Sequence, residues 1–517
     1  MTESNLMVES ESKGLTRRRV PAPCAMVIFG ASGDLTERKL VPALYYLFRA
    51  GLLADGFLAI GCAKTPYSDE AFREKMRAGV RKYLNIPPAD YGNLDTFLTN
   101  LYYMAGDFGN CQAYSELKER LSQIDAQQRT GGNRLFYLAT PPSVFPGTVE
   151  HLGDAGFAQP KEGGQSWTRI VIEKPFGRDL ASARELNQIV TCVFKEDQVY
   201  RIDHYLGKET VQNLLVFRFG NGIFEPFWNR RYIDHVQIAV AEDIGVENRA
   251  SYYEEAGLVR DMIQNHVLSL LSLVTMEPPA IFDATAVRDE KAKVMRAVRP
   301  LPLDHLNDYA VRGQYVEGWS NEQRLPAYRA ETKVSPQSTT ETFTALKLFI
   351  DNWRWADVPF YLRSGKRLPK RISEITVRFR RAPHLLFKET GLKSIEPNRL
   401  SIHIQPDEGM SLRFNAKIPG TTMQIQPVTM NFHYEDAFGH APPSTAYETL
   451  LLDCMLGDSM LFTRDDFVEL AWELLTPVLS RWHDDGRKGL SFYEAGTWGP
   501  PEADAFMERD GRNWQDL

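Results

Sequence analysis

The chain has 517 residues, of which 43% are hydrophobic and 25% charged, a balance typical of a globular protein rather than a disordered or collagen-like chain. The length predicts about two to four domains. The formal net charge of -7 argues against a dedicated nucleic-acid-binding protein, although a few local cations would suffice for a small anionic substrate.

Between residues 24 and 190, short apolar runs alternate with segments of helical periodicity. Strands are predicted at 24–30, 57–64, 101–108, 133–142 and 169–177. Helices are predicted at 35–53, 69–84, 114–125 and 179–190. This alternation with short connections predicts a parallel, doubly wound sheet.

The alternation fades after about residue 200. A strand is predicted at 235–243 and one long helix at 254–274. Later runs alternate apolar and polar residues, which predicts an antiparallel sheet with one wetted face, at 342–350, 374–381, 399–406 and 422–432. The last hundred residues are mainly helical, with helices predicted at 445–456 and 464–482.

The predicted fold class is therefore α/β. Residues 1–20 are predicted to form a disordered tail and residues 21–203 a Rossmann-like dinucleotide-binding domain. Residues 204–517 are predicted to form a larger α+β domain with an antiparallel sheet.

Cysteine usage and the absence of targeting patterns indicate a location. The five cysteines include no C-x-x-C pair, which favours a reducing compartment. The N-terminus has no apolar signal region, and the most apolar stretch, 262–276, is shorter than the roughly 20 residues of a spanning helix. We therefore expect a soluble cytoplasmic protein without membrane contact, and no metal-ligand spacing predicts a metal site.

A glycine-containing turn follows the first predicted strand. It comprises Gly30, Ala31, Ser32, Gly33, Asp34 and Leu35. Glycines at this place let backbone N–H groups approach a pyrophosphate at the start of a helix. The spacing departs from G-x-G-x-x-G, so a strand–helix turn without a ligand is the alternative.

Two lysines stand where predicted strands end. Lys64 ends the second strand, where a cation favours the 2′-phosphate of NADP, and a solvated surface lysine is the alternative. Lys174 precedes Pro175 at the end of the fifth strand, where it would point into the cleft over the sheet. Pro175 could be cis, or it could simply stop an edge strand.

Two further segments combine acids with histidines. In the segment 201–209, His204, Tyr205 and Lys208 can donate to a phosphate, and Asp203 is the kind of acceptor that orients an imidazole. A solvated charged turn is the alternative. In the second segment Asp261 and Asn265 are four residues apart in an apolar helix, which predicts a shared face with His266 beside it. A satisfied core histidine is the alternative there.

The segment 363–371 is rich in arginine and lysine and is predicted to be a basic loop between strands. A solvated turn explains it equally well unless the substrate is an anion.

Taken in order, these motifs resemble the glucose-6-phosphate dehydrogenase family over nearly the whole chain. The resemblance rests on GASGDL, FYLATPP, IEKPFGRDL, RIDHYLGKE, LVRDMIQNH, PFYLRSGKRL and the late AYETLLLD and LFTR, of which RIDHYLGKE is the most specific.

The resemblance implies a role for each matching position. His266 resembles the general base and Asp203 its carboxylate partner. The implied substrate-binding residues are His204, Tyr205, Lys208, Glu242, Asp261, Lys366, Arg371 and Gln405. The implied cofactor-binding residues are Gly30, Ala31, Ser32, Gly33, Asp34, Leu35, Thr36, Glu37, Lys64, Asp107, Phe108 and Lys174.

The implied reaction is oxidation of glucose 6-phosphate to 6-phosphogluconolactone with NADP, with some use of NAD, by a homodimer or homotetramer. Lys64 stands where the family usually has arginine, and Arg371 where it usually has lysine. Ile372 and His403 replace basic residues of the family's second, structural NADP site, so we expect that site to be missing. An NADP-dependent oxidoreductase of another sugar and a non-catalytic NADPH sensor are the alternatives.

Overall fold

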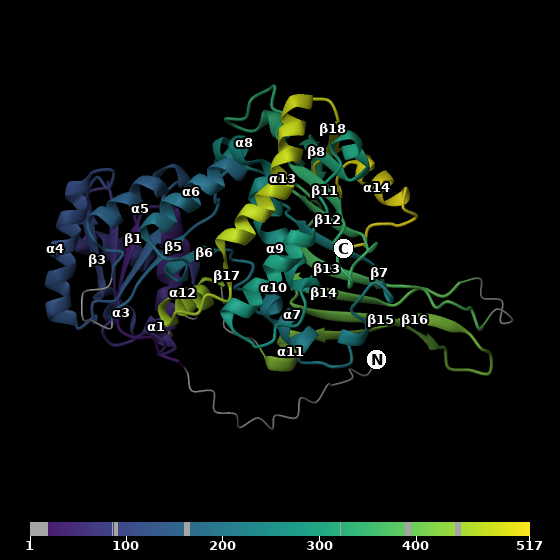
Figure 1. Ribbon diagram of the computed structural model, residues 1–517, viewed down its shortest axis with the longest axis horizontal. Coiled ribbons are helices and arrows are strands. Elements are labelled where there is room, and N and C mark those ends of the chain that lie inside the picture. Colours follow the sequence, from purple (N-terminus) through teal and green to yellow (C-terminus); the bar gives the residue numbers. More distant parts are fainter. Residues whose placement is uncertain are drawn as a thin grey trace.

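The computed structural model describes residues 19–84, 86, 91–159, 166–320, 322–387, 394–439 and 446–517. All but the last two residues of the predicted tail, 1–20, lie outside the described residues. The chain forms two bodies side by side, each built around its own sheet (Figure 1).

The first sheet has seven strands in the order β17-β6-β5-β4-β1-β2-β3, and all pairs except β17–β6 are parallel. Its strands are β1 (Ala25–Phe29), β2 (Leu58–Ala63), β3 (Leu101–Ala105), β4 (Arg134–Leu138), β5 (Thr168–Ile172), β6 (Val199–Ile202) and β17 (Phe462–Thr463). Its helices are η1 (Thr36–Leu40), α1 (Val41–Arg49), α2 (Asp69–Tyr83), α3 (Leu94–Leu98), α4 (Cys111–Gln128), α5 (Phe145–Asp154) and α6 (Leu180–Val193).

The predicted doubly wound sheet is confirmed. Strand order reverses between β1 and β4, which are neighbours although two strands separate them in the chain. In such sheets, ligands bind beyond the carboxyl ends of the strands at this switch point.

The second sheet has nine strands in the order β16-β15-β14-β13-β7-β12-β11-β8-β18. They are β7 (Ile233–Ala241), β8 (Ala310–Val316), β11 (Phe343–Leu348), β12 (Phe360–Gly365), β13 (Ile372–Phe379), β14 (Arg399–Gln405), β15 (Gly409–Lys417), β16 (Ile425–His433) and β18 (Leu490–Glu494). A separate hairpin joins β9 (Gly318–Ser320) to β10 (Gln323–Leu325).

The second sheet is antiparallel as expected, apart from two pairs. β12 pairs with β7 and β18 with β8 in parallel, because helical crossovers separate the partners in the chain. The helices are α7 (Glu209–Phe219), α8 (Ala250–Leu258), η7 (Val259–Val267), α9 (Leu268–Thr275), α10 (Ala284–Ala297), α11 (Tyr434–Phe438), α12 (Tyr447–Leu456), α13 (Asp465–Asp485) and α14 (Pro501–Glu508).

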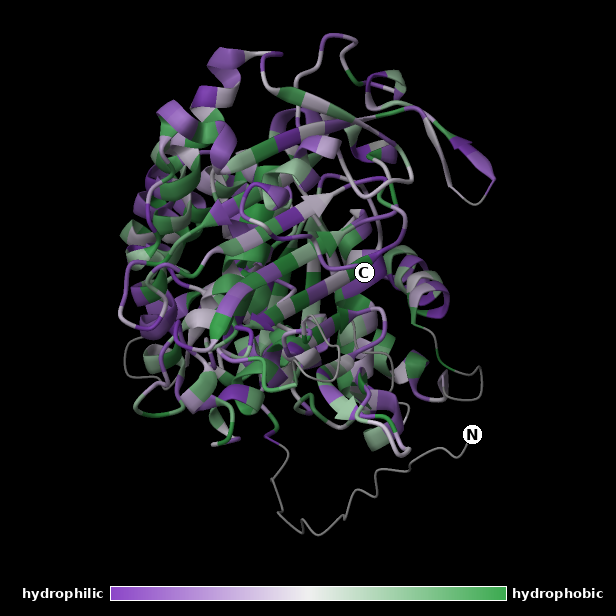
Figure 2. Cartoon of the chain, turned by 90° about the vertical axis from the view of Figure 1, so that its right-hand side faces the viewer, coloured by the Kyte–Doolittle hydropathy of each residue, from purple (hydrophilic) through white to green (hydrophobic). Residues whose placement is uncertain are grey.

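The strands of this sheet differ in burial. Apolar and polar residues alternate along the strands that face the viewer in Figure 2. β7 and β12 are buried almost throughout, whereas β16 is largely exposed and projects with β15 beyond the rest of the molecule (Figure 1).

No helix in the described ranges has the length and apolar character needed to cross a membrane.

The prediction of one continuous helix over 254–274 is wrong. Gly257 has φ +65° and ψ 178°, which breaks the helix inside the last turn of α8. Residues 259–267 then form the π-helix η7, and α9 continues from it. A positive φ suits glycine, so the break falls at that residue.

The chain returns to the first sheet late, beyond the predicted domain boundary at 203/204. Leu450, Leu451 and Cys454 of α12 share a core with the helices that cover β1 and β2. β17 then pairs with β6 in the register Phe462↔Ile202. Two distant segments thus meet beside the strand that ends just before Asp203.

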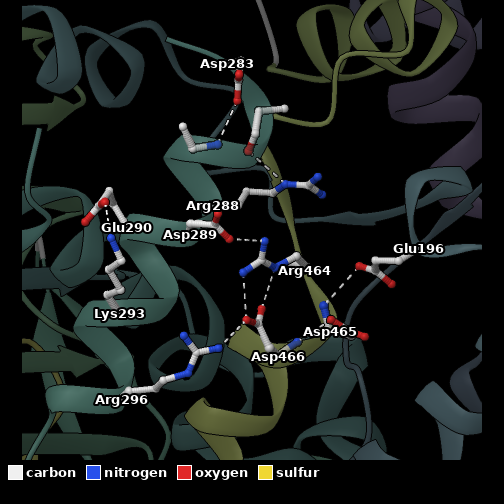
Figure 3. A network of polar contacts seen from close by, with 12 residues as sticks. Glu196, Asp283, Arg288, Asp289, Glu290, Lys293, Arg296, Arg464, Asp465 and Asp466 are labelled. Carbon is white, nitrogen blue, oxygen red and sulfur yellow. Dashed lines mark hydrogen bonds and ion pairs between the residues drawn. The ribbon is translucent and has the colours of Figure 1, made fainter. Parts of the chain in front are cut away.

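An ionic network fixes the junction between β17 and α13 (Figure 3). Arg464 donates to Asp466 at 2.9 Å and to Asp289 of α10 at 2.6 Å. The backbone N–H of Asp465 donates to Glu196, which also accepts from the buried Arg201 of β6 at 2.6 Å. The network ties β6 to the helices of the second body.

Candidate active site

The turn after β1 is shaped for close backbone approach. Gly30 has φ +83°, and a Cβ there would lie 2.6 Å from the Ala139 carbonyl oxygen. Its N–H donates to the Cys62 carbonyl at 2.8 Å, and the Gly33 N–H donates back to the Gly30 carbonyl at 2.9 Å. The predicted tight strand–helix turn is present at the switch point of the sheet.

A cleft of about 930 Å³ opens over this turn, between the two bodies. It is lined by Asp34, Leu35, Arg38, Lys39, Ala139, Thr140, Pro142, Glu173, Lys174, Pro175, His204, Lys208, Glu209, Arg249, Tyr252, Arg371, Glu408, Ala446 and Tyr447. Six residues predicted for the site, Asp34, Leu35, Lys174, His204, Lys208 and Arg371, therefore line one cavity.

The residues of the turn fit a dinucleotide in different ways. The side chains of Ala31 and Thr36 in the turn, and of Phe108 in the loop after β3, are buried in the first body, so only their backbone could face a cofactor. The Thr36 hydroxyl is buried and has no hydrogen-bond partner among the described residues. Glu37 pairs with Lys75 at 3.3 Å, and Lys75 donates to the Ser32 carbonyl at 2.9 Å, which fixes the outer side of the turn.

The lysine predicted to meet the 2′-phosphate of NADP lies on the surface, beyond the cleft. Lys64 follows β2 directly, and its Nζ lies 3.0 Å from Asp107 Oδ1. Their side chains are 78% and 61% exposed. This cation is therefore free to exchange one acceptor for another.

The centre of the site is a buried acid–imidazole pair. His266 Nδ1 lies 2.5 Å from Asp203 Oδ1, and the two side chains are 0% and 2% exposed. The other carboxylate oxygen of Asp203 has no partner among the described residues. Since Asp203 is an acceptor, the proton of the neutral imidazole resides on Nδ1, which leaves the Nε2 lone pair for another group.

Two residues of η7 contact Lys174. Lys174 Nζ donates to the Asp261 carbonyl at 2.8 Å and lies 2.9 Å from His266 Nε2. Asn265 instead donates to the Arg260 carbonyl at 3.3 Å, and its backbone neighbour His266 is the residue that meets Lys174. The shared face of Asp261 and Asn265 stays a prediction.

Burial and charge set the proton affinities of the pair. Burial lowers the pKa of His266, and Lys174 adds to this effect while Asp203 opposes it. Burial alone would raise the pKa of Asp203, but the charge and hydrogen bond of His266 bring it well below its usual range. At neutral pH the structure therefore holds an ionised acid against a neutral imidazole.

A second ion pair borders this centre. Lys366 Nζ donates to Glu242 Oε2 at 2.7 Å and lies 3.8 Å from Asp261 Oδ2. The predicted basic loop over 363–371 is wrong for its first part, because residues 363–365 belong to β12. The alternative of a solvated turn does not hold for Lys366, which is buried. The basic run therefore enters the site from a strand end.

Anion-binding groups gather on the other side of His266. The Tyr205 ring stacks on His266 with centroids 4.5 Å apart, and its hydroxyl lies 3.1 Å from Ser373. Lys208 donates to Gln405 and lies over the Tyr205 ring at 4.7 Å. Burial, followed by the charge of Arg371, lowers the pKa of Lys208 to about 8.

Further residues of the cleft were given no role by the sequence. Lys39 lies near Arg371, and burial together with neighbouring cations lowers its pKa. Glu173 accepts from Tyr137 at 2.5 Å and Tyr447 at 3.2 Å. Glu173 and Tyr447 belong to motifs that the sequence already showed, whereas the approach of Lys39 to Arg371 depends on long-range folding.

The doubly wound sheet, the turn at its switch point and the buried base beside a cationic cleft define a nicotinamide-dinucleotide-dependent oxidoreductase. Residues 27–213 match the family model "Glucose-6-phosphate dehydrogenase, NAD binding domain", and residues 215–515 match "Glucose-6-phosphate dehydrogenase, C-terminal domain". The chain belongs to the glucose-6-phosphate dehydrogenase family.

Individual relatives agree with this assignment. A glucose-6-phosphate 1-dehydrogenase of Chlamydia pneumoniae is 46% identical over 514 residues, covering 99% of each chain. A glucose-6-phosphate 1-dehydrogenase 2 of Mycobacterium tuberculosis is 47% identical over 498 residues, covering 96% of this chain and 95% of that one.

Solved structures agree as well. A glucose-6-phosphate dehydrogenase in complex with its substrate glucose-6-phosphate superposes with a TM-score of 0.86 at 37% identity, covering 96% and 99% of the two chains. The glucose-6-phosphate 1-dehydrogenase of Mycobacterium avium gives 0.79 at 35% identity with the same coverage.

Proposed function

We propose that the chain oxidises D-glucose 6-phosphate at C1 to 6-phospho-D-glucono-1,5-lactone with NADP, the first oxidative step of the pentose phosphate pathway. The observation that carries this proposal is the buried Asp203–His266 pair. The second ring nitrogen of His266, Nε2, lies next to Lys174 at the edge of the dinucleotide cleft.

His266 is the general base in this proposal. Its Nε2 accepts the proton of the C1 hydroxyl group, since Nδ1–H is engaged with Asp203. NADP, when bound, would supply the acceptor for the hydrogen that leaves C1 with its electron pair. Asp203 stabilises the resulting imidazolium without taking the proton itself.

Lysines and acids around His266 orient the sugar. Lys174 donates to His266 and Asp261, so a sugar hydroxyl that replaces one of these contacts is held against the base. Glu242 and Asp261 accept from sugar hydroxyls in this proposal, and Lys366 fixes both acids. Such preorganisation supports hydride transfer through proximity.

The phosphate site comprises His204, Tyr205, Lys208 and Arg371, with Gln405 as a positioning partner of Lys208. Charge-assisted hydrogen bonds to a dianion are among the stronger polar contacts. Lys208 and Arg371 line the cleft and already lie close enough for their charges to interact. Their mutual repulsion favours an anion between them.

The cofactor site combines the turn with two lysines. The backbone of 30–37 would hold the pyrophosphate at the start of η1, with Asp107 and Phe108 beside the adenosine and Lys174 beside the nicotinamide. Lys64 would exchange Asp107 for the 2′-phosphate of NADP.

The test is NADPH formation, followed by absorbance, with glucose 6-phosphate, glucose, and a panel of other sugar phosphates. We expect turnover with glucose 6-phosphate and NADP to exceed every other pair. Preference for another sugar would contradict the substrate assignment, and NADP binding without turnover would favour the NADPH-sensor alternative.

We also propose a homodimer or homotetramer in a reducing, cytoplasmic setting. The exposed strand β16 carries Val428 and Met430, which are 38% and 60% exposed and would be covered in an assembly. All five cysteines are free thiols. Light scattering after size exclusion tests the assembly, and a monomer at working concentration would contradict it.

A further inference from the structure

The helix that carries Asp261 and His266 starts at a break in the chain. α8 is broken at Gly257, and η7 begins at Val259, only two residues before Asp261. The first N–H groups of a helix lack intrahelical acceptors and must find others when they are buried. Leu258 and Val259 are both buried, so their N–H groups need partners within the protein.

Glu341 supplies both partners. Its carbonyl accepts the Leu258 N–H at 3.1 Å, and its carboxylate Oε1 accepts the Val259 N–H, also at 3.1 Å. The residue is 6% exposed, just ahead of β11. In such a dry place, hydrogen bonds are stronger than at the surface and the loss of one leaves a buried donor unsatisfied.

The shape of the break matches this contact. A Cβ at Gly257 would lie 2.5 Å from the Glu341 carboxylate oxygen, so only glycine leaves room for the side chain. The same glycine adopts the positive φ that turns the chain from α8 into η7. The break at Gly257 and the hydrogen bonds to Glu341 therefore depend on each other.

The residue after Glu341 reaches the second ion pair of the site. The Lys366 N–H donates to the Thr342 carbonyl at 2.9 Å, and the Tyr493 hydroxyl donates to the Lys366 carbonyl at 2.7 Å. The two residues 341 and 342 thus touch the start of the base-bearing helix on one side and Lys366 on the other.

We infer that Glu341 is a positioning residue for the reaction: its carboxylate caps η7 and thereby sets His266 and Asp261 against the sugar. The inference rests on the proposed role of His266 as base. Burial raises the pKa of Glu341, opposed chiefly by backbone N–H groups. The cap needs only an oxygen acceptor, so a glutamine serves as well as a glutamate.

The test compares Glu341→Ala with Glu341→Gln in the full-length enzyme, with kcat expressed per folded active site. We expect Glu341→Ala to lower kcat by roughly 10- to 100-fold, since small misplacements of a catalytic group have effects of this size. The KM for NADP should stay within about twofold, because the turn at Gly30 is untouched, and Glu341→Gln should stay within about threefold of the parent.

Glu254→Ala is the matched control. Glu254 is also a glutamate that accepts several hydrogen bonds, from Tyr328 and Ser338 at 2.6 Å, but it lies on α8 before the break. We expect this variant to lower the melting temperature without changing kcat per folded site. Backbone hydrogen exchange over 258–267 should rise in Glu341→Ala and stay unchanged in Glu254→Ala.

An unchanged kcat and unchanged exchange in folded Glu341→Ala would overturn the inference. A Glu341→Gln variant as slow as Glu341→Ala would also overturn it, because the charge would then matter rather than the cap. His266→Asn in the same series separates the two proposals, since normal turnover there refutes the base while the exchange readout still tests the cap.

Discussion

The Asp203–His266 pair and the Lys64–Asp107 pair are both contacts between an acid and a nitrogen base, and they differ in burial. Asp203 and His266 are 2% and 0% exposed, whereas Lys64 and Asp107 are 78% and 61% exposed. A buried pair controls tautomer and proton affinity because no water competes, whereas an exposed pair contributes about 0–1 kcal/mol and exchanges easily. The buried pair therefore suits a base that is held in one position, and the exposed pair suits a lysine that exchanges Asp107 for a ligand.

Removal of the base is the change with the largest expected effect. His266→Asn should lower kcat by about 10²–10⁴, the usual contribution of a general base, with little change in KM for the sugar. Steady-state kinetics on glucose 6-phosphate measure this. A folded variant with near-normal turnover would refute the role of the buried pair.

The exposed pair should affect the cofactor alone. A charge-assisted contact contributes about 1.5–3 kcal/mol, which corresponds to roughly 10- to 150-fold. Because Lys64 is 78% exposed, we expect Lys64→Ala to lower kcat/KM for NADP near the small end of that range. NAD efficiency should stay within about threefold, since NAD has no 2′-phosphate.

Lys118→Ala is the control for this experiment, because Lys118 is an exposed lysine on α4 that bonds the Ala155 carbonyl. If NADP and NAD lost efficiency together in Lys64→Ala, the lysine would support the fold or the pyrophosphate. If neither fell, Arg38 or Lys39 would be the next candidates for the 2′-phosphate.

The proposed phosphate site should make kcat/KM for glucose 6-phosphate depend on pH. The pKa of Lys208 is lowered to about 8, so in the free enzyme its charge is lost as the pH rises through that value. We expect kcat/KM for glucose 6-phosphate to fall above pH 8, at most about tenfold per unit. Lys208→Ala should abolish this limb while hardly affecting the weak use of glucose. A limb that persisted in the variant would assign it to another group.

The sequence predicted local features better than long-range ones. The alternation over 24–190 predicted the first sheet, and the glycines predicted the turn at Gly30, because both depend on neighbouring residues. The pairing of β17 with β6 and the entry of Glu341 beneath η7 join segments that are far apart, which periodicity does not report.

The site shows the same division. The resemblance to the family proposed Asp203 and His266, and their contact appears only in the folded chain. The π-helix over 259–267 was not predicted, because the apolar pattern of this segment does not distinguish a π-helix from an α-helix. The burial of Arg363 was not predicted either, because a charged residue is expected at the surface when its place in a strand is not known.

The most direct test of the buried pair is the pH profile of kcat/KM for glucose 6-phosphate in the parent enzyme and in Asp203→Asn. The pKa of His266 is lowered by burial, while Asp203 raises it, so the parent should lose activity only below about pH 6.5, the unperturbed value. Removal of the carboxylate charge should move this acid limb to still lower pH and reduce the plateau rate, by less than His266→Asn does. An acid limb at the same pH or at higher pH in Asp203→Asn would contradict the account.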